Sequence, residues 1–281
     1  MRGIATWGGA ALAATVLGAA AASAAGAPGA PVAAGPGLVV AQRGTIHVEG
    51  RAVVKGDQPT WSPDGKRIAF QRNGEIHVVD RDGRNERRLT RRAPGLHWPA
   101  SYPAWSRDGT RIAFSGTRDL YTVVVATGAF TRLTHSEQSW LGNLTAAYSP
   151  DGKTIAFSRS TDAFNNDLFL MRADGTHLRR LTRTRGTDGR QGEETMPTWS
   201  PDGRTIVFVS NRDDNWELYA IGRDGRGERR ITRTARTDES SPRFARDGTR
   251  ILFVHDGRVA TIGLDGTGVR ELGAGRSADW R

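Results

Sequence analysis

Short apolar runs recur along the chain at regular intervals, and each run closely follows an Asp-Gly pair. The runs are three residues long, are built from Ile, Ala, Val, Leu and Phe, and have polar or charged residues close by on both sides. Runs of this length between turn residues predict strands that are buried on both faces. We expect such strands at residues 68–70, 112–114, 155–157, 206–208 and 251–253.

Further apolar segments follow every run. The first set predicts a third strand in each repeat, at residues 76–79, 120–123, 168–171, 218–221 and 259–262. A turn then leads to a fourth strand, which ends at Leu89, Leu133, Leu181, Ile231 or Leu272. Together with a first strand before each Asp-Gly pair, this makes four short strands per repeat, which is the composition of a propeller blade.

The first strand of each repeat ends in a shared motif. It reads Pro-x-Trp-Ser-Pro-Asp-Gly at residues 59–65 and 197–203, with variants at 103–109, 146–152 and 242–248. Successive copies of its Asp lie 43 to 51 residues apart, close to the length of a propeller blade, at Asp64, Asp108, Asp151, Asp202 and Asp247. Because the Asp occurs in every copy, we interpret it as a turn residue that binds its own backbone, not as a catalytic acid.

The two ends of the chain complete the repeat count. Residues 38–40, 45–48 and 52–54 read as second, third and fourth strands without a first, whereas residues 278–280 read as a first strand alone. One blade built from both ends, added to five internal blades, gives six. The sequence therefore predicts an all-β fold, a six-bladed β-propeller of four-stranded blades, closed by pairing N-terminal strands with a C-terminal inner strand.

The N-terminal segment has a different composition from the repeats. Residues 4–22 are almost wholly apolar or small, and Ala22-Ser23-Ala24 offers a small-x-small cleavage site. This pattern indicates a signal peptide at residues 1–24, with an uncleaved membrane anchor as the alternative. Residues 25–37 are rich in Ala, Gly and Pro and read as a linker, so we place the propeller at residues 38–281.

Composition narrows the classes of protein. The 281 residues carry a net charge of +10 and no Cys, which excludes a disulfide scaffold, a cysteine-ligated metal site and a thiol enzyme. A positive charge permits anionic partners but identifies none. The doublets Arg87-Arg88, Arg179-Arg180 and Arg229-Arg230 fall on the outermost strands, where charge blocks strand addition; a footprint for a polyanion is the alternative reading.

The repeat resembles the WD40-like PD40 repeats of TolB-type propellers. The resemblance rests on Pro-x-Trp-Ser-Pro-Asp-Gly, the Ile-x-Phe strand after it, and the repeat endings Leu89-Thr90, Leu133-Thr134, Leu181-Thr182 and Ile231-Thr232. It implies a periplasmic protein-binding propeller, notably one that binds the peptidoglycan-associated lipoprotein. Strands begin directly after the linker, so we do not expect the α/β domain that precedes the TolB propeller. The same repeat precedes the hydrolase domain of prolyl-oligopeptidase-like peptidases, which we do not expect here because the sequence stops at Arg281.

The repeats differ most in the loops expected at the mouth of the central channel, where second-to-third-strand loops and interblade loops emerge. Long loops there carry Trp, Phe, Asn and acidic residues, a composition that suits recognition of a partner. Ordinary solvated loops with Trp packed beneath them are the alternative. The candidate partner-binding residues are Trp98, Trp140, Phe164, Asn165, Asn166, Asp167, Asp213, Asn215, Trp216 and Glu194.

These patterns favour a secreted, periplasmic or cell-surface binding module that is monomeric and non-catalytic. We expect its partner to be a protein or a cell-envelope component, and we expect no cofactor, no metal, no specific nucleic acid and no membrane span after signal cleavage. No nucleophile elbow, phosphate loop or His-x-x-x-His pair occurs in the sequence.

Two alternatives remain. One is a propeller hydrolase or lactonase-like enzyme that uses carboxylates or a metal at the channel mouth; it requires two carboxylates with separated pKa values or three converging ligands. Its candidates are Asp57, Glu194, Glu239, Asp119 and His255. The other is a structural cell-surface scaffold with a flat, solvated face and no small ligand.

Overall fold

The computed structural model describes residues 32–91, 99–116, 118–136, 142–161, 165–184 and 192–281. The predicted signal peptide, at residues 1–24, and the first part of the predicted linker lie outside these residues. In the described part of the chain, no helix is long and apolar enough to cross a membrane.

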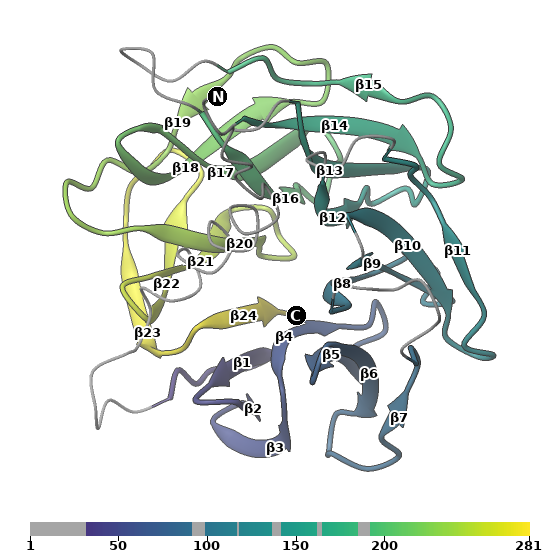
Figure 1. Cartoon of the computed structure of the whole chain (residues 1–281). Coiled ribbons are helices and arrows are strands. Elements are labelled where there is room, and N and C mark those ends of the chain that lie inside the picture. The colour runs from purple at the N-terminus through teal and green to yellow at the C-terminus, as the bar shows by residue number, and fades with distance from the viewer. Residues whose placement is uncertain (1–31, 92–98, 117, 137–141, 162–164, 185–191) are drawn as a thin grey trace, which may run out of the picture.

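Six four-stranded antiparallel sheets surround a central channel, which confirms the predicted six-bladed β-propeller (Figure 1). The closing blade uses both ends of the chain, in the order β24 (Ser277–Trp280), β1 (Leu38–Gln42), β2 (Thr45–Val48) and β3 (Arg51–Lys55). The first internal blade contains β4 (Asp57–Trp61), β5 (Arg67–Arg72), β6 (Glu75–Asp80) and β7 (Arg87–Arg88). The second contains β8 (Ser101–Trp105), β9 (Arg111–Gly116), β10 (Asp119–Val124) and β11 (Phe130–Arg132).

The remaining blades repeat the same order from the channel outward. The third internal blade contains β12 (Asn143–Tyr148), β13 (Thr154–Ser160), β14 (Asn166–Arg172) and β15 (Arg179–Arg180). The fourth contains β16 (Glu194–Trp199), β17 (Thr205–Asp213), β18 (Asn215–Gly222) and β19 (Arg229–Arg230). The fifth contains β20 (Glu239–Phe244), β21 (Arg250–His255), β22 (Arg258–Gly263) and β23 (Arg270–Ala274).

The second strands are continuously apolar because each blade is covered on both faces by its neighbours. Ile68, Ala69 and Phe70 of β5 are all fully buried, although their side chains alternate between the two faces. The same Phe position is fully buried in the next three blades, at Phe114, Phe157 and Phe208. Replacing such a side chain by Ala typically costs about 3–5 kcal/mol. This apolar strand is the main source of the hydrophobic core.

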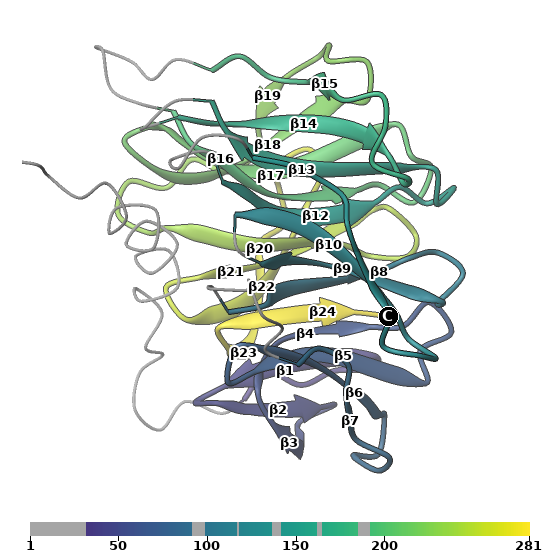
Figure 2. The ribbon, with the colours of Figure 1, turned by 45° about the vertical axis from the view of Figure 1, so that its right-hand side comes forward.

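The closing blade joins the ends of the chain. β24 pairs with β1, with Leu38 opposite Trp280 and Ala41 opposite Ser277. Figure 1 shows the yellow β24 beside the purple β1, and Figure 2 shows β24 close to β4 of the first internal blade. β24 also contacts the first internal blade, because the carboxylate of Asp279 accepts hydrogen bonds from Trp61 N (2.7 Å) and Thr60 Oγ1 (3.0 Å). The predicted shared blade is therefore confirmed.

The motif after each inner strand is a turn, as the sequence predicts. In the first internal blade, Ser62 Oγ donates to Asp64 Oδ1 over 2.6 Å and accepts from Arg67 N over 2.9 Å. Gly65 follows with φ +66°. Hydrogen bonds lower the pKa of Asp64, first that from Ser62 and then that from Lys66 N. The carboxylate is committed to the turn, so its function is architectural.

Where the motif contains Trp, its indole links the blade to the one before it. Trp105 Nε1 donates to Thr60 O over 3.2 Å, and Trp199 Nε1 donates to Ala147 O over 3.1 Å. The indole thus covers apolar surface and satisfies its own donor across a blade interface.

Packing begins earlier than the sequence predicts. Ala33 is buried, and its N–H donates to Ala274 O over 3.0 Å, beside a parallel bridge between Val32 and Ala274. The end of the expected linker therefore lies against β23 of the fifth internal blade, so ordered packing begins before Leu38.

Candidate functional site

The inner strands do not run straight through the channel. In each internal blade, the pairing of the inner strand with its neighbour shifts register, which marks a β-bulge. At each bulge, one residue other than glycine has a left-handed backbone conformation. These residues form what we call the channel belt: Gln58, Tyr102, Thr145, Met196 and Ser241, with φ between +30° and +54°.

The channel belt connects the blades to one another. Gln58 Oε1 accepts from Tyr102 N over 2.7 Å, Thr145 Oγ1 accepts from Met196 N over 3.0 Å, and Met196 Sδ accepts from Ser241 N over 3.2 Å. Each bond joins a bulge to the next blade of the ring. The strained backbone at these positions is therefore tied to hydrogen bonds that hold the ring together.

The channel belt also narrows the channel. Tyr102 packs against the apolar cluster of the fourth and fifth internal blades that contains Met196, so its ring crosses the channel. Burial raises the pKa of Tyr102 to about 12, so the phenol stays neutral. The space left at this level is a cavity of about 40 Å³. The belt divides the channel into a mouth, where the inner strands begin, and an opposite turn end, where the Ser-Pro-Asp-Gly turns lie.

At the mouth, a carboxylate directly precedes the apolar part of the third strand in four of the internal blades. These residues are Glu75, Asp119, Asp167 and Glu217. In the second internal blade, Asp119 accepts hydrogen bonds from Thr134 Oγ1 (2.7 Å), Arg132 Nε (3.0 Å) and Ser136 N (3.0 Å). Thr134 Oγ1 in turn accepts from Leu120 N over 3.0 Å. The Thr of each Leu-Thr or Ile-Thr ending thus joins the fourth strand to the third.

Several arginines of the outer-strand doublets also make contacts within the propeller. In two of the three doublets the second member forms an ion pair, since Arg180 binds the buried Asp167, and Arg230 binds the buried Glu217 over 2.6 Å. Among the first members, Arg87 Nη1 donates to Ala126 O of the next blade over 3.1 Å, and Arg179 donates to Arg223 O. These four arginines therefore contribute to holding the scaffold together. A repeated acid at the third strand, followed by Arg-x-Thr, was the sequence signal for this network.

Two adjacent acids lie at the start of the fourth internal blade: Glu194 is buried and Glu193 is partly buried. Burial raises the pKa of Glu194 to about 7, although Arg212, Thr182 and Thr184 all bind its carboxylate. Burial also raises the pKa of Glu193 to about 7, against a hydrogen bond of 3.2 Å from Asn166 Nδ2.

A second pair of acids meets across the fourth and fifth internal blades. Glu217 and Glu239 are 0% and 1% exposed. Burial, and then the charge of Glu217, raise the pKa of Glu239 to about 8. Burial also acts to raise the pKa of Glu217, but hydrogen bonds from Thr232, Thr234 and Arg230 outweigh it, so that pKa is lowered. Sequence reasoning selected Glu239 and missed Glu217, which lies in another blade.

The structure brings some of the predicted partner-binding residues together. Asp213, Asn215 and Trp216 surround the tip of the β17–β18 hairpin, and Asn165 and Asn166 lie at the end of the β13–β14 hairpin. Asp167 and Glu194 are buried in the networks described above. Trp98, Trp140 and Phe164 lie outside the described residues.

The tip of the β17–β18 hairpin is held on several sides. Asn215 Nδ2 donates to Thr234 O (2.8 Å) and Thr237 O (2.9 Å), and Trp216 N donates to Asp238 Oδ1 (3.1 Å). Trp216 is half-buried and packs against the core cluster of the fourth and fifth internal blades. The indole is therefore fixed in place while part of it faces solvent.

The residues proposed for an enzyme do not converge. Asp57 binds Ser277 Oγ over 3.0 Å, and Asp119 is neutralised by Arg132. Within the described ranges, no three His, Asp or Glu side chains are grouped so that they could hold a metal ion. The acids that do meet, Glu217 and Glu239, are both shielded from solvent.

The protein is therefore a six-bladed propeller. Trp side chains hydrogen-bond between neighbouring blades, and Thr and Arg side chains bind the carboxylates at the channel mouth. Residues 75–278 match the family model described as the TolB beta propeller domain, PD40. The chain belongs to this family, as its repeats indicate.

Known proteins show similarity over different parts of the chain. A TolB homolog of Chlorobium luteolum is 30% identical over 162 residues, which are 58% of this chain and 33% of the relative. The chain therefore spans about a third of the length of this curated relative. The structure of a putative TolB from Agrobacterium tumefaciens aligns with a TM-score of 0.69 at 22% identity, covering 85% of this chain and 91% of the other. An oligogalacturonate lyase in complex with manganese aligns with a TM-score of 0.58 at 19% identity, covering 80% and 69%. Such similarities show a shared fold.

Proposed function

We propose that this propeller is a non-catalytic, monomeric binding module of the cell envelope, and that it binds a protein partner through the mouth side of its third and fourth internal blades. Membership of the TolB propeller family supports the envelope location and the protein partner. The mouth side is preferred because the repeats differ most there, so its residues are not required by the repeat.

The observation that carries this proposal is the rigid β17–β18 hairpin. Its strands are nine and eight residues long, the longest in the described chain, and its tip is tied to Thr234, Thr237 and Asp238. Trp216 is therefore presented in a fixed orientation before a partner arrives. Preorganisation of this kind reduces the conformational entropy lost on binding. A half-exposed Trp is also the side chain most typical of an interface hot spot.

The neighbouring hairpin extends the same surface. Asn166 forms an isolated β-bridge with Glu193, and its side-chain amide donates a hydrogen bond to the Glu193 carboxylate. The backbone N–H of Glu193 in turn donates to Asn211 Oδ1 of β17 over 2.7 Å. The ends of the two hairpins are thus linked through the segment that precedes β16. We infer that a partner meets one continuous surface over two blades.

An enzyme remains the second candidate because of one observation. Glu217 and Glu239 form a carboxyl pair in which one pKa is lowered and the other is raised to about 8, as an acid–base pair requires. Both side chains are buried, so a substrate would reach them only after the segment at Thr234 and Thr237 moved away. The pair therefore supports a structural role better than a catalytic one.

A binding experiment tests the proposal. The wild-type protein and Trp216→Ala would be immobilised, partners would be captured from the envelope fraction of the source cells and identified, and each affinity would then be measured with purified partner. We expect the substitution to weaken binding by about 30-fold, equivalent to about 2 kcal/mol, with little dependence on salt.

A matched variant controls for loss of any exposed aromatic side chain. Phe130 is 45% exposed on β11, in another blade, so Phe130→Ala should leave the affinity unchanged. Unaltered binding by a folded Trp216→Ala protein would contradict the proposed surface. Loss of binding only on replacing the outer-edge arginines, with a steep salt dependence, would instead indicate a polyanion partner.

A further inference from the structure

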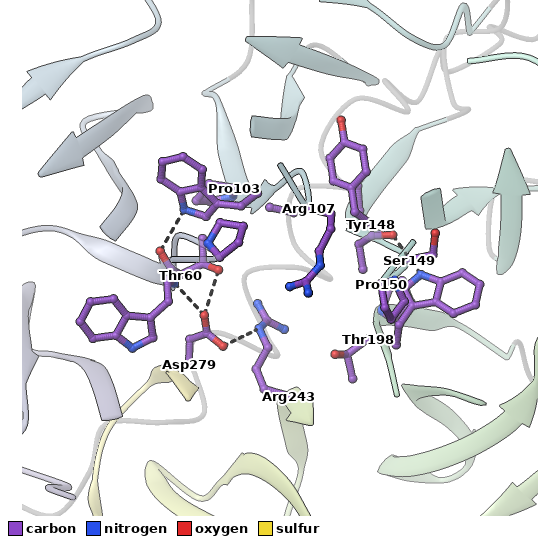
Figure 3. A pocket seen from close by; sticks show the side chains of 17 residues that line it. Thr60, Pro103, Arg107, Tyr148, Ser149, Pro150, Thr198, Arg243 and Asp279 are labelled. Carbon is purple, nitrogen blue, oxygen red and sulfur yellow. Dashed lines mark hydrogen bonds and ion pairs between the residues drawn. The ribbon is translucent and has the colours of Figure 1, made fainter. Parts of the chain in front are cut away.

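The turn end of the channel contains a cavity that the proposed function does not use. Its volume is about 260 Å³, and all six inner strands or the turns after them contribute to its wall. Figure 3 looks into this cavity and shows the side chains that line it. The channel belt separates it from the mouth, so a ligand here would not compete with a partner on the mouth side.

Two of the lining residues that depart from the repeat are arginines. Arg107 stands at a turn position where three other blades have Pro63, Pro150 and Pro201. Arg243 stands on β20 at a channel-facing position that holds Thr or Ala in the other internal blades. The repeat does not require either arginine, since the same backbone forms without them. Their presence at one cavity therefore needs another explanation.

The two guanidinium groups point toward each other across the middle of the cavity (Figure 3). Within the described part of the chain, the Arg107 side chain has no hydrogen-bond or ion-pair partner, and the residue is exposed to solvent. Arg243 Nη1 donates to Pro242 O over 2.8 Å. Like charges that face each other without a bridging anion repel, so the arrangement favours a ligand with negative charge.

The one acid among the lining residues offsets only one of the two arginine charges. Asp279 Oδ1 forms an ion pair with Arg243 Nε over 3.8 Å, a distance too long for a hydrogen bond. Its carboxylate is already engaged by Trp61 N and Thr60 Oγ1 in holding the closing blade. The lining therefore keeps one uncompensated positive charge, and the donors of both guanidinium groups are largely free.

We propose that this cavity is an anion-binding site, in which Arg107 and Arg243 together bind the carboxylate or phosphate group of a small molecule. Planar guanidinium groups match the geometry of both oxyanions and form charge-assisted hydrogen bonds with them. The Thr198 hydroxyl points into the same space (Figure 3). Pro103, Pro150 and Tyr148 supply apolar wall for the rest of the ligand.

Titration with two probes tests this site and distinguishes the two sources of negative charge. Succinate and inorganic phosphate would be added separately to wild-type protein at constant ionic strength, with chloride as the balancing anion. Arginine Nε–Hε signals in NMR spectra report on the two side chains directly. We expect saturable shifts of the Arg107 and Arg243 signals with at least one probe, and that probe identifies the ligand chemistry.

Consensus substitutions provide the variants. Arg107→Pro and Arg243→Thr introduce residues that the repeat itself carries at these positions, so the turn and strand should still form. We expect each to weaken binding of the effective probe at least tenfold. Arg246→Pro is the matched control, because Arg246 occupies the same turn position as Arg107 but does not line the cavity.

Three outcomes would overturn the proposal. The first is that neither probe shows saturable binding. The second is that binding survives in the Arg107→Pro, Arg243→Thr double variant. The third is that Arg246→Pro loses binding to the same extent, which would indicate diffuse surface charge. If either variant fails to fold by circular dichroism, the NMR titration of the wild-type protein decides alone. None of these outcomes depends on whether Trp216 binds a partner.

Discussion

Buried acids at the channel mouth show how a residue type can mislead when its neighbours are unknown. Asp167 and Glu194 read from the sequence as acids available to a partner, but both are enclosed by hydroxyl groups and arginines. Glu217 was not among the residues predicted from the sequence, yet it shares a buried site with Glu239. Such pairs join residues of different blades, and their spacing along the chain carries no signal for the contact.

The Glu217–Glu239 pair predicts a dependence of stability on pH. Because the pKa of Glu239 is raised to about 8 in the folded state, its stabilising contribution is complete at acidic pH and is lost as the pH rises through 8. Glu193 and Glu194, with pKa values raised to about 7, act in the same direction. We expect the melting temperature to fall between pH 6 and pH 9.

Glu239→Gln should reduce this fall, because the amide keeps a donor toward Glu217 and does not titrate. Thermal unfolding followed by circular dichroism across the pH range measures the effect. Asp265→Asn is the control, since the lowered pKa of Asp265, caused first by its bond from Thr267 N, affects stability only at acidic pH. Parallel curves for wild type and Glu239→Gln would show that Glu239 is not protonated in the fold.

At the scale of strands and turns, much of the fold could be predicted because each blade repeats the same chemistry. The Ile-x-Phe strands, the Ser-Asp turns and the shared closing blade all follow from local patterns. The bulges of the inner strands could not be predicted, because Gln58, Tyr102 and Met196 share no residue type that favours a left-handed backbone. Their conformation is imposed by hydrogen bonds from neighbouring blades, which only the assembled ring supplies.

The bulge in β20 predicts opposite effects at two adjacent serines. Ser241 has φ +52°, where Gly is favoured over other residues, whereas Ser240 does not have a positive φ. Ser241→Gly should raise the free energy of unfolding by about 0.5 kcal/mol, since relief of backbone strain exceeds the added chain entropy. Ser240→Gly should lower it by about 0.5–1 kcal/mol. Chemical denaturation measures both, and a similar loss in the two variants would argue against strain at the bulge.

For the whole molecule, the interface between β1 and β24 is the place where the ring is joined. Every other blade is continuous in sequence, but this one depends on strands from opposite ends of the chain. The chain contains no Cys, so a new disulfide can be introduced here without competing thiols.

A Val40→Cys, Ala278→Cys double variant should close the ring covalently, because these residues face each other in the β1–β24 pairing. A disulfide of suitable geometry stabilises by about 2–4 kcal/mol, mainly by restricting the unfolded chain. The melting temperature should therefore be higher in the oxidised protein than in the same protein after reduction. Failure of the two thiols to oxidise, with the protein folded, would contradict this register.

The shared blade also sets an order of events during synthesis. While the chain grows, β1 can pair with β2 and β3, but the inner edge of its sheet stays open until residues 277–280 have left the ribosome. The internal blades can form earlier from local contacts, whereas ring closure joins the most distant segments of the sequence and is expected to be slow. A nascent chain that stalls before β24 would expose an unpaired strand edge, which makes unfinished chains targets for chaperones and proteases. Closure of the ring by β24 is therefore the step at which we expect such recognition to end.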